Sequence, residues 1–378
     1  MNNFIMRSAL LLAVITLSAC GGSGQKELPN GGIWPDNAGQ HINAHGGGIL
    51  KQGDTYYWYG QFMVAGEAGN AAQVGVSCYS SRNLLDWKNE GIALSVSEDP
   101  ASEIVKGSII ERPKVIYNAQ TGKYVMWFHL ELYGMGYKAA RCGIAVSDSP
   151  TGPFTYLRSL RPNAGHYALN ATAYHRRTDN YPPEQRFTGG VLPSPIDEGN
   201  MNIHGRDMAG GQMSRDMNLF VDTDGRAYLI HASEENSTLH ITRLTEDYLD
   251  TDSLYVRLFP GRFHEAPAMF KKGSKYYMIT SDCTGWAPNA ARSMCADGIF
   301  GEWRELGNPC VGADSDLTFH GQSTYVLQVG EGADARYIFM ADRWTPENAI
   351  DGRYLWLPIS FEGERPVIRW QDMFTGVK

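Results

Sequence analysis

The sequence lacks long runs of charge and, after its first twenty residues, long apolar runs. Lys and Arg total 33 against 41 Asp and Glu, a formal net charge of -8 at pH 7, and neither sign gathers into a block. This argues against a nucleic-acid backbone or an anionic membrane surface as the main partner. No later stretch approaches the ~18 consecutive apolar residues of a membrane-spanning helix. We therefore expect a water-exposed globular body.

Cysteine is also scarce. Apart from Cys20, the sequence holds Cys78, Cys142, Cys283, Cys295 and Cys310. Their spacing matches no zinc motif, so no metal centre is predicted from them. Pairing of Cys283 with Cys295, or of either with Cys310, stays open, and the odd number predicts at least one buried free thiol.

The first twenty residues differ from the rest. Arg7 precedes an apolar run of about ten residues, the length of a signal-peptide core rather than a membrane span. The run ends in Leu-Ser-Ala-Cys20, which resembles a bacterial lipobox and implies cleavage and lipid attachment at Cys20; an ordinary secretory signal is the alternative. We predict a signal peptide over 1–19, a lipid-anchored tether over 20–29 and one folded domain over 30–378.

The predicted location is the bacterial cell envelope, facing the periplasm or the outer surface. The residues after Cys20 are Gly-Gly-Ser-Gly, a flexible composition without the acidic run expected of an outer-surface signal. This composition favours the periplasm. The lipid would be the only contact with the membrane.

Glycine and aromatic residues are abundant, with 42 Gly, 20 Tyr and 9 Trp, as expected of short strands joined by tight turns. Five segments share a polar turn followed by a strand that begins with an aromatic residue, and each predicts the second strand of a hairpin: 53–59, 122–128, 225–231, 273–279 and 334–340. Three later turns carry an aromatic plug, at Trp87, Phe154 and Trp303.

The five repeats predict an all-β fold, a five-bladed β-propeller closed into a ring. A β-sandwich or barrel is the alternative, but five matched units with the plug motif favour the propeller. One gap between repeats is much longer than the others, and it predicts an insertion over about 155–212 in the third blade. A loop of that length in a compact domain is usually functional.

The starts of the innermost strands are expected to converge near the ring axis. Four polar residues precede the apolar parts of these strands: Glu111, Asp216, Glu265 and Gln322. Carboxylates gathered there repel one another and lose water, which raises the pKa of at least one. Glu265 is the best candidate for a protonated general acid. The alternatives are a surface or salt-bridged Glu265 and local ion pairs of Asp216 with Arg215 and of Glu111 with Arg112.

The strand motifs Ala44-His-Gly-Gly-Gly, Glu111-Arg-Pro-Lys, Ser214-Arg-Asp-Met, Glu265-Ala-Pro-Ala and Cys283-Thr-Gly-Trp286 resemble glycoside hydrolase family 43. The resemblance covers nearly the whole chain after the signal and is closest to the exo-β-1,3-galactanase group. It implies that Glu265 is the general acid and that Asp216 modulates its pKa and orients the substrate. It further implies galactose contacts at Glu111, Tyr137, Asn236 and Thr284.

One departure from the family concerns the general base. Most members carry an Asp on the first blade, where this sequence reads Asn43-Ala-His45. The galactanase group shares the absence and is thought to use a glutamine, which corresponds to Gln322, acting by positioning water or as an imidic-acid base. Gln61 replaces a Glu of many relatives. Trp286 and Trp344 are candidates for packing on the sugar, or else core plugs.

The resemblance implies an inverting, exo-acting hydrolase that releases galactose from β-1,3-galactan backbones of arabinogalactan. The alternatives are an α-L-arabinofuranosidase or β-galactofuranosidase of the same family, and a non-catalytic carbohydrate-binding lipoprotein. The expected partners are galactan or arabinogalactan oligosaccharides bound by a monomer, with no nucleic acid. His45, His231, His264 and His320 match no zinc spacing. No cofactor is expected to be required, although an axial calcium is possible, as in some family members.

Overall fold

Five antiparallel sheets make up most of the described chain, which comprises residues 26–183 and 192–376 of a computed structural model. The first sheet contains β2 (His45–Gln52), β3 (Thr55–Met63), β4 (Gln73–Ser81) and β5 (Lys88–Ser95). The second contains β6 (Ile109–Asn118), β7 (Lys123–Glu131), β8 (Arg141–Ser147) and β9 (Thr155–Leu160). The third contains β10 (Met217–Val221), β11 (Ala227–Ser233), β12 (Thr238–Leu244) and β13 (Thr251–Leu258).

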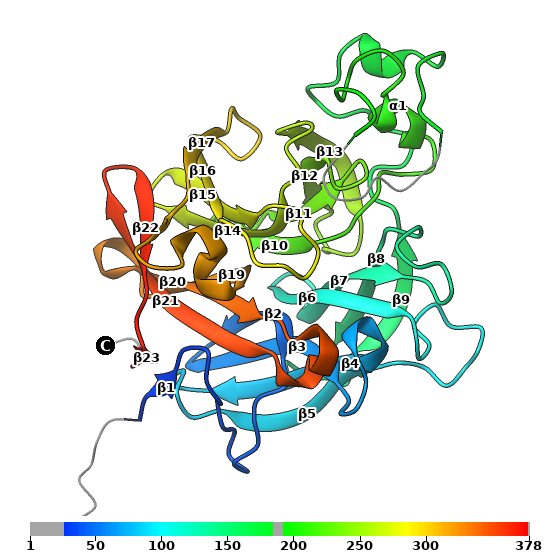
Figure 1. Ribbon diagram of the computed structural model, residues 1–378. Helices are drawn as coiled ribbons and strands as arrows, with labels where there is room; N and C mark the ends of the chain where they lie inside the picture. Colours follow the sequence, from blue (N-terminus) through cyan, green and yellow to red (C-terminus); the bar gives the residue numbers. More distant parts are fainter. Residues whose placement is uncertain (1–25, 184–191, 377–378) are drawn as a thin grey trace, which may run out of the picture.

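The remaining sheets complete the ring seen in Figure 1. The fourth contains β14 (Glu265–Lys272), β15 (Lys275–Ser281), β16 (Arg292–Ala296) and β17 (Arg304–Gly307). The fifth contains β19 (Gln322–Val329), β20 (Arg336–Arg343), β21 (Arg353–Glu362) and β22 (Arg365–Arg369), with β18 (Cys310–Val311) parallel to β22. β1 (Leu28–Pro29) pairs with β23 (Met373–Phe374), so the folded body includes residue 28, slightly before the predicted boundary.

The predicted five-bladed β-propeller is confirmed. Each innermost strand contacts the next around the ring, in the order β2, β6, β10, β14, β19 and back to β2. Five hydrophobic clusters fill the spaces between neighbouring sheets, including the junction of the fifth sheet with the first, where Trp58 and Trp356 pack together. Because every sheet is packed on both sides, the aromatic-led second strands β3, β7, β11, β15 and β20 are largely buried.

The three predicted plugs are also buried. Trp87, Phe154 and Trp303 each lie between the third and fourth strands of their sheet and are at most 7% exposed. Each side chain joins one of the clusters that separate two sheets. The repeated turn motif therefore marks a repeated packing position.

The long irregular segment does not lie where the sequence predicted it. Residues 155–160 form β9, the outer strand of the second sheet. The segment 161–216 connects the second and third sheets, and its described residues, 161–183 and 192–216, form no strand. Its described part holds the 3-10 helix Tyr174–Arg176 and α1 (Ile203–Asp207), beside the third sheet in Figure 1. The segment therefore precedes the third blade and does not interrupt it. The predicted start was too early because the short β9, with its several polar residues, is hard to distinguish from a loop in the sequence.

Other short 3-10 helices occupy connections: Gly69–Ala72, Ser315–His320, Gly332–Asp334 and Pro346–Asp351. None of the described helices is long and apolar enough to cross a membrane. The predicted signal peptide and Cys20 lie outside the described residues. The five other cysteines are all free thiols, so the disulfides left open by the sequence do not form, and only Cys283 is partly exposed.

Three innermost strands begin with a β-bulge that the sequence did not predict. The register shifts after His45, Glu111 and Glu265, and the next residue of each strand has a positive φ: 61° at Gly46, 54° at Arg112 and 51° at Ala266. A bulge turns a side chain relative to the regular pleat and occurs often beside active sites. Here it sets the direction of the first side chain of each strand.

Candidate active site

A cavity of about 270 Å³ lies where the innermost strands begin. Its wall is mainly polar or aromatic and comes from all five sheets and their loops: Gln61, Glu111, Arg112, His129, Tyr137, Arg215, Asp216, Asn236, Glu265, Gly285, Trp286, Gln322 and Trp344. The small volume, a few convergent polar groups and two Trp rings are typical of a site for one small polar ligand. The predicted convergence of Glu111, Asp216, Glu265 and Gln322 is confirmed.

Glu265 is the first residue of β14, and within residues 26–183 and 192–376 no cationic side chain is hydrogen-bonded to it. Its Oε1 accepts hydrogen bonds from Asn236 Nδ2 at 2.8 Å and from Cys283 Sγ at 3.2 Å. Burial and the nearby charge of Asp216 raise its pKa to about 8, although the Cys283 contact and Arg112 act in the opposite direction. The raised pKa favours the protonated carboxylic acid at neutral pH. Since none of the described residues forms a salt bridge with Glu265, the alternative of a salt-bridged surface Glu is wrong.

Asp216 pairs with Arg112 rather than with its neighbour Arg215. Arg112 Nε and Nη2 donate to the two oxygens of Asp216 at 3.2 and 2.9 Å, and the amide of Ala266 donates to Oδ2 at 3.1 Å. Such a bidentate contact holds the carboxylate in one orientation. It places a fixed negative charge beside Glu265.

Glu111 does not pair with Arg112 by hydrogen bonds. Its carboxylate accepts from His129 Nδ1 at 2.8 Å and from the Tyr137 hydroxyl at 2.7 Å. Burial alone would raise the pKa of Glu111, but the hydrogen bonds and charge of His129 outweigh burial and lower it. Burial likewise opposes protonation of His129, yet contacts to Glu111 and Glu131 raise its pKa to about 9. The result is a carboxylate and an imidazolium in the cavity wall.

Gln322 is held by three neighbours. Its Oε1 accepts from Arg112 Nη2 at 2.6 Å and from Trp344 Nε1 at 2.9 Å, and its Nε2 donates to Ser281 Oγ at 2.9 Å. Both groups at the oxygen can only donate, so the direction of the amide is unambiguous. One amide hydrogen remains for a molecule in the cavity.

The two candidate Trp residues both line the cavity, so they are not buried core plugs. Their rings meet edge to face with centroids 5.5 Å apart, and Trp286 is 41% exposed. Gln61 also lies in the wall, so the departure from the family at this position falls on the cavity. Apolar sugar faces pack well on such rings.

Thr284 does not line the cavity. Its side chain is exposed and its hydroxyl donates to the carbonyl of Ala287, which stabilises the local turn.

The sequence analysis did not identify three polar residues near the site as site residues: Arg112, the cation shared by Asp216 and Gln322, His129, and Asp342. Asp342 lies opposite Gln322 on β20, accepts from the amide of Gly46 at 2.6 Å, and has its pKa raised to about 7 by burial.

His129 and Asp342 could have been found by pairing each innermost strand with the second strand of its hairpin, counting from the turn between them. His129 stands opposite Glu111, and Asp342 stands opposite Gln322. In both hairpins a bulge shifts the pairing by one position, so a count from the turn alone would have been misleading. The signal for Arg112 is weaker, because its partner Asp216 is 104 residues away.

Two groups of described residues could be taken for metal ligands, and neither fits well. In the group Glu111, His129 and Asp216, both ring nitrogens of His129 already contact carboxylates, and Arg112 already binds both oxygens of Asp216. In the group His204, Glu234 and His240, Arg257 already binds both oxygens of the carboxylate. Lys114 is buried nearby, and its Nζ donates to the carbonyls of Gly46 and Arg112. Burial and the charge of Arg112 lower the pKa of Lys114 well below its usual value.

The comparisons point to one family. The family model of glycosyl hydrolases family 43 matches residues 190–326. A solved family 43 β-1,3-galactosidase with galactodeoxynojirimycin is 49% identical, over 91% of this chain and 99% of that chain, with a TM-score of 0.83. No curated protein matches the sequence.

Two exo-β-1,3-galactanases are also similar. The enzyme from Clostridium thermocellum is 36% identical over 92% of this chain and 66% of that chain, with a TM-score of 0.72. The enzyme from Phanerochaete chrysosporium, solved with β-1,3-galactotriose, is 29% identical over 92% of this chain and 68% of that chain, with a TM-score of 0.71. This chain thus spans about two thirds of each.

Proposed function

The chain belongs to glycoside hydrolase family 43, and we propose that it is an exo-acting, inverting enzyme that releases galactose from β-1,3-galactan. The galactan backbone of arabinogalactan is the proposed natural substrate. The observation that carries the proposal is that a protonated Glu265 and the oriented amide of Gln322 open onto one small cavity. The names of the similar enzymes, β-1,3-galactosidase and exo-β-1,3-galactanase, support the substrate.

Glu265 acts as the general acid. Both hydrogen bonds that it accepts reach Oε1, which leaves Oε2 to carry the proton. This proton passes to the glycosidic oxygen as the bond from that oxygen to the anomeric carbon breaks. The fixed charge of Asp216 keeps the acid protonated before the reaction and stabilises the positive charge that develops on the sugar ring.

Gln322 acts as an amide that positions the attacking water. An imidic-acid tautomer would place a hydrogen on Oε1, where both contacting groups, of Arg112 and Trp344, can only donate. The remaining hydrogen on Nε2 can hold a water molecule. In an inverting enzyme this water lies on the face of the sugar opposite the leaving group. The general acid and the group that activates the water are then roughly 6.5–9.5 Å apart.

The other wall residues bind the galactose. Glu111, Tyr137 and Asn236 offer hydrogen-bonding groups, and Trp286 with Trp344 offers apolar faces. No metal or other cofactor is required in this scheme, because Arg112 and His129 supply positive charge around the site. We further propose that the enzyme acts as a monomer held in the cell envelope by lipid on Cys20. Labelling with radioactive palmitate, lost in Cys20→Ala, tests the lipid.

Product analysis tests the proposed function. The purified protein is incubated with β-1,3-galactan and, separately, with arabinan, and the first turnovers are followed by NMR. We expect galactose alone, first in the α form, because inversion at a β-linked carbon produces the α-anomer. β-Galactose would contradict inversion, and longer fragments would contradict exo action.

Two further outcomes support other functions. Arabinose from arabinan would favour the arabinofuranosidase alternative. Binding of galactan without any product would favour a carbohydrate-binding protein.

A further inference from the structure

The turn between β11 and β12 has an unusual backbone. Glu234, Glu235 and Asn236 have φ values of 50°, 58° and 67°, so three consecutive residues that carry side chains adopt the left-handed region. This region is unfavourable for residues other than glycine. Such conformations persist only where the surroundings hold them, and they concentrate at functional sites.

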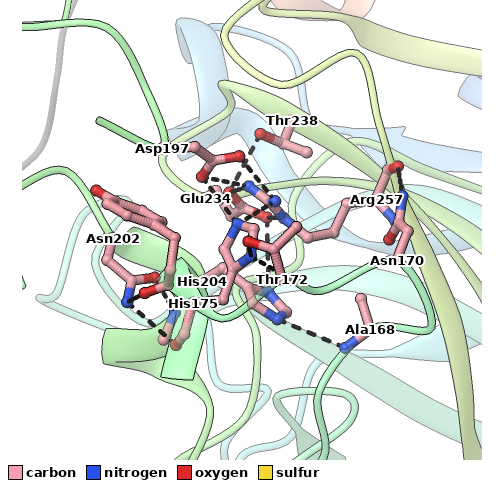
Figure 2. Close-up of polar contacts among 12 residues, drawn as sticks. Ala168, Asn170, Thr172, His175, Asp197, Asn202, His204, Glu234, Thr238 and Arg257 are labelled. Carbon is pink, nitrogen blue, oxygen red and sulfur yellow. Dashed lines mark hydrogen bonds and ion pairs between the residues drawn. The ribbon is translucent and has the colours of Figure 1, made fainter. Parts of the chain in front are cut away.

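A buried ion-pair network holds the first residue of the turn. Arg257, on β13, donates from Nε and Nη2 to the two oxygens of Glu234, both at 2.6 Å. The same guanidinium donates twice to Asp197, at 2.9 Å each, as Figure 2 shows. His240 lies 2.8 Å from Glu234 Oε1. Asp197 belongs to the segment 161–216, so Arg257 ties this segment to the turn.

The second residue of the turn is held from the same segment. Glu235 is buried, and it accepts from Arg206 Nη2 at 3.1 Å and from Arg215 Nη2 at 3.4 Å. Arg206 is part of α1. Arg215 also donates from Nη1 to Asn236 Oδ1 at 3.3 Å, which leaves the amide nitrogen of Asn236 facing the other way.

The third residue reaches the acid. Asn236 Nδ2 donates to Glu265 Oε1 at 2.8 Å. We infer that Glu234 and Glu235, with Arg257, Asp197 and Arg206, are positioning residues that hold Asn236 against Glu265 and so orient the general acid. This inference rests on the proposed function. It also gives the segment 161–216 a role, since Asp197 and Arg206 complete the network.

Glu234→Gln is the main test, because Gln has the same size but cannot balance Arg257, which keeps Asp197 as a partner. We expect kcat on β-1,3-galactobiose to fall about 10- to 100-fold, the loss typical of a misplaced catalytic group. We expect little change on an aryl β-galactoside whose phenol is acidic, because that leaving group needs no proton from Glu265. The alkaline limb of the kcat profile should move to higher pH, since the Asn236 hydrogen bond favours the carboxylate.

Asp197→Asn is a milder second variant, because this carboxylate is 25% exposed, and it should show the same pattern with a smaller loss. Asp252→Asn is the matched control. It removes an ion pair with Arg243 between the same strands, β12 and β13, away from the turn, and should leave both substrates unaffected.

An equal loss on both substrates, or an unmoved alkaline limb, would overturn the inference and make the network purely structural. If wild type fails to cleave galactobiose, the proposed function is wrong. The positioning is then tested by the pKa of Glu265 itself, read by carbon-13 NMR of labelled Glu side chains. A pKa unchanged between wild type and Glu234→Gln would overturn it.

Discussion

Two glutamates on neighbouring sheets are both largely removed from water, yet their pKa values move in opposite directions. Burial raises the pKa of Glu265 to about 8, and the nearby Asp216 adds to the effect. Burial also opposes the charged form of Glu234, but the charge and hydrogen bonds of Arg257, with help from His240, lower its pKa well below the usual range. The presence of a paired cation, rather than burial, decides which form each side chain takes.

The same contrast separates the two polar regions of the molecule. Around the cavity, Arg112 is hydrogen-bonded to Asp216 and Gln322, and in the described part of the chain no cationic side chain is hydrogen-bonded to Glu265. In the network of Figure 2, Arg257 pairs with both Glu234 and Asp197. The arrangement around the cavity leaves the proton of Glu265 available for catalysis. The network around Arg257 joins the segment 161–216 to the third sheet.

Glu265→Gln should have the largest effect on activity. We expect kcat on β-1,3-galactan to fall about 10²- to 10⁴-fold, the usual contribution of a general acid. Binding of galactose should persist, because the wall is otherwise unchanged. Steady-state kinetics and calorimetric titration with galactose measure the two quantities. Unchanged product release would remove Glu265 from its role.

Arg257→Gln should have the largest effect on stability. It leaves Glu234 and Asp197 without their shared cation, and removal of one partner from a buried ion pair costs about 3–5 kcal/mol. Urea unfolding measures the loss. The control is Arg262→Gln, at an exposed pair with Glu305, where we expect less than about 1 kcal/mol. Equal losses in the two variants would contradict the distinction between the regions.

The activity should depend on the ionisation of Glu265. The acid is active when protonated, so kcat should be steady below its pKa of about 8 and fall as the pH rises through that value. Well above it, the fall approaches about tenfold per pH unit, because each unit removes nine tenths of the remaining protonated enzyme. A pH profile of kcat on galactobiose measures this. An alkaline limb near pH 5 would show that Glu265 is ionised like Glu234.

The free energy of unfolding should depend on pH through His204, which lies beside the buried ion-pair network. Burial lowers the pKa of His204 from 6.5 to about 3, so the unfolded chain binds a proton between these values that the folded chain does not. The contribution of neutral His204 to stability is thus fully present above pH 6.5. It is lost as the pH drops toward 3, by up to about 1.4 kcal/mol per pH unit. His204→Gln should flatten the slope measured by urea unfolding between pH 4.5 and 7. The exposed His166→Gln should leave it unchanged, and an equal slope in all three proteins would contradict the prediction.

Much of the site could be predicted because its signals are local. The glycine turns and the aromatic residues that follow them predicted the five hairpins, and the polar residues before each hairpin predicted Glu111, Asp216, Glu265 and Gln322 as one group. The role of Thr284 came only from the resemblance, and the structure uses its hydroxyl within its own turn. The length of the segment after the second sheet was visible, but its position relative to β9 was not.

The sequence by itself determined the repeat, the hairpins and the side chains that begin the innermost strands, because alternation and turn formation depend on residues close together in the chain. The tertiary structure decided the partners. A bulge places Glu111 opposite His129, and the packing of the second sheet against the third brings Arg112 to Asp216 across 104 positions. A shift of one residue reverses the face of a strand, and charges interact through space rather than along the sequence. Only the folded ring could therefore determine which glutamate keeps its proton.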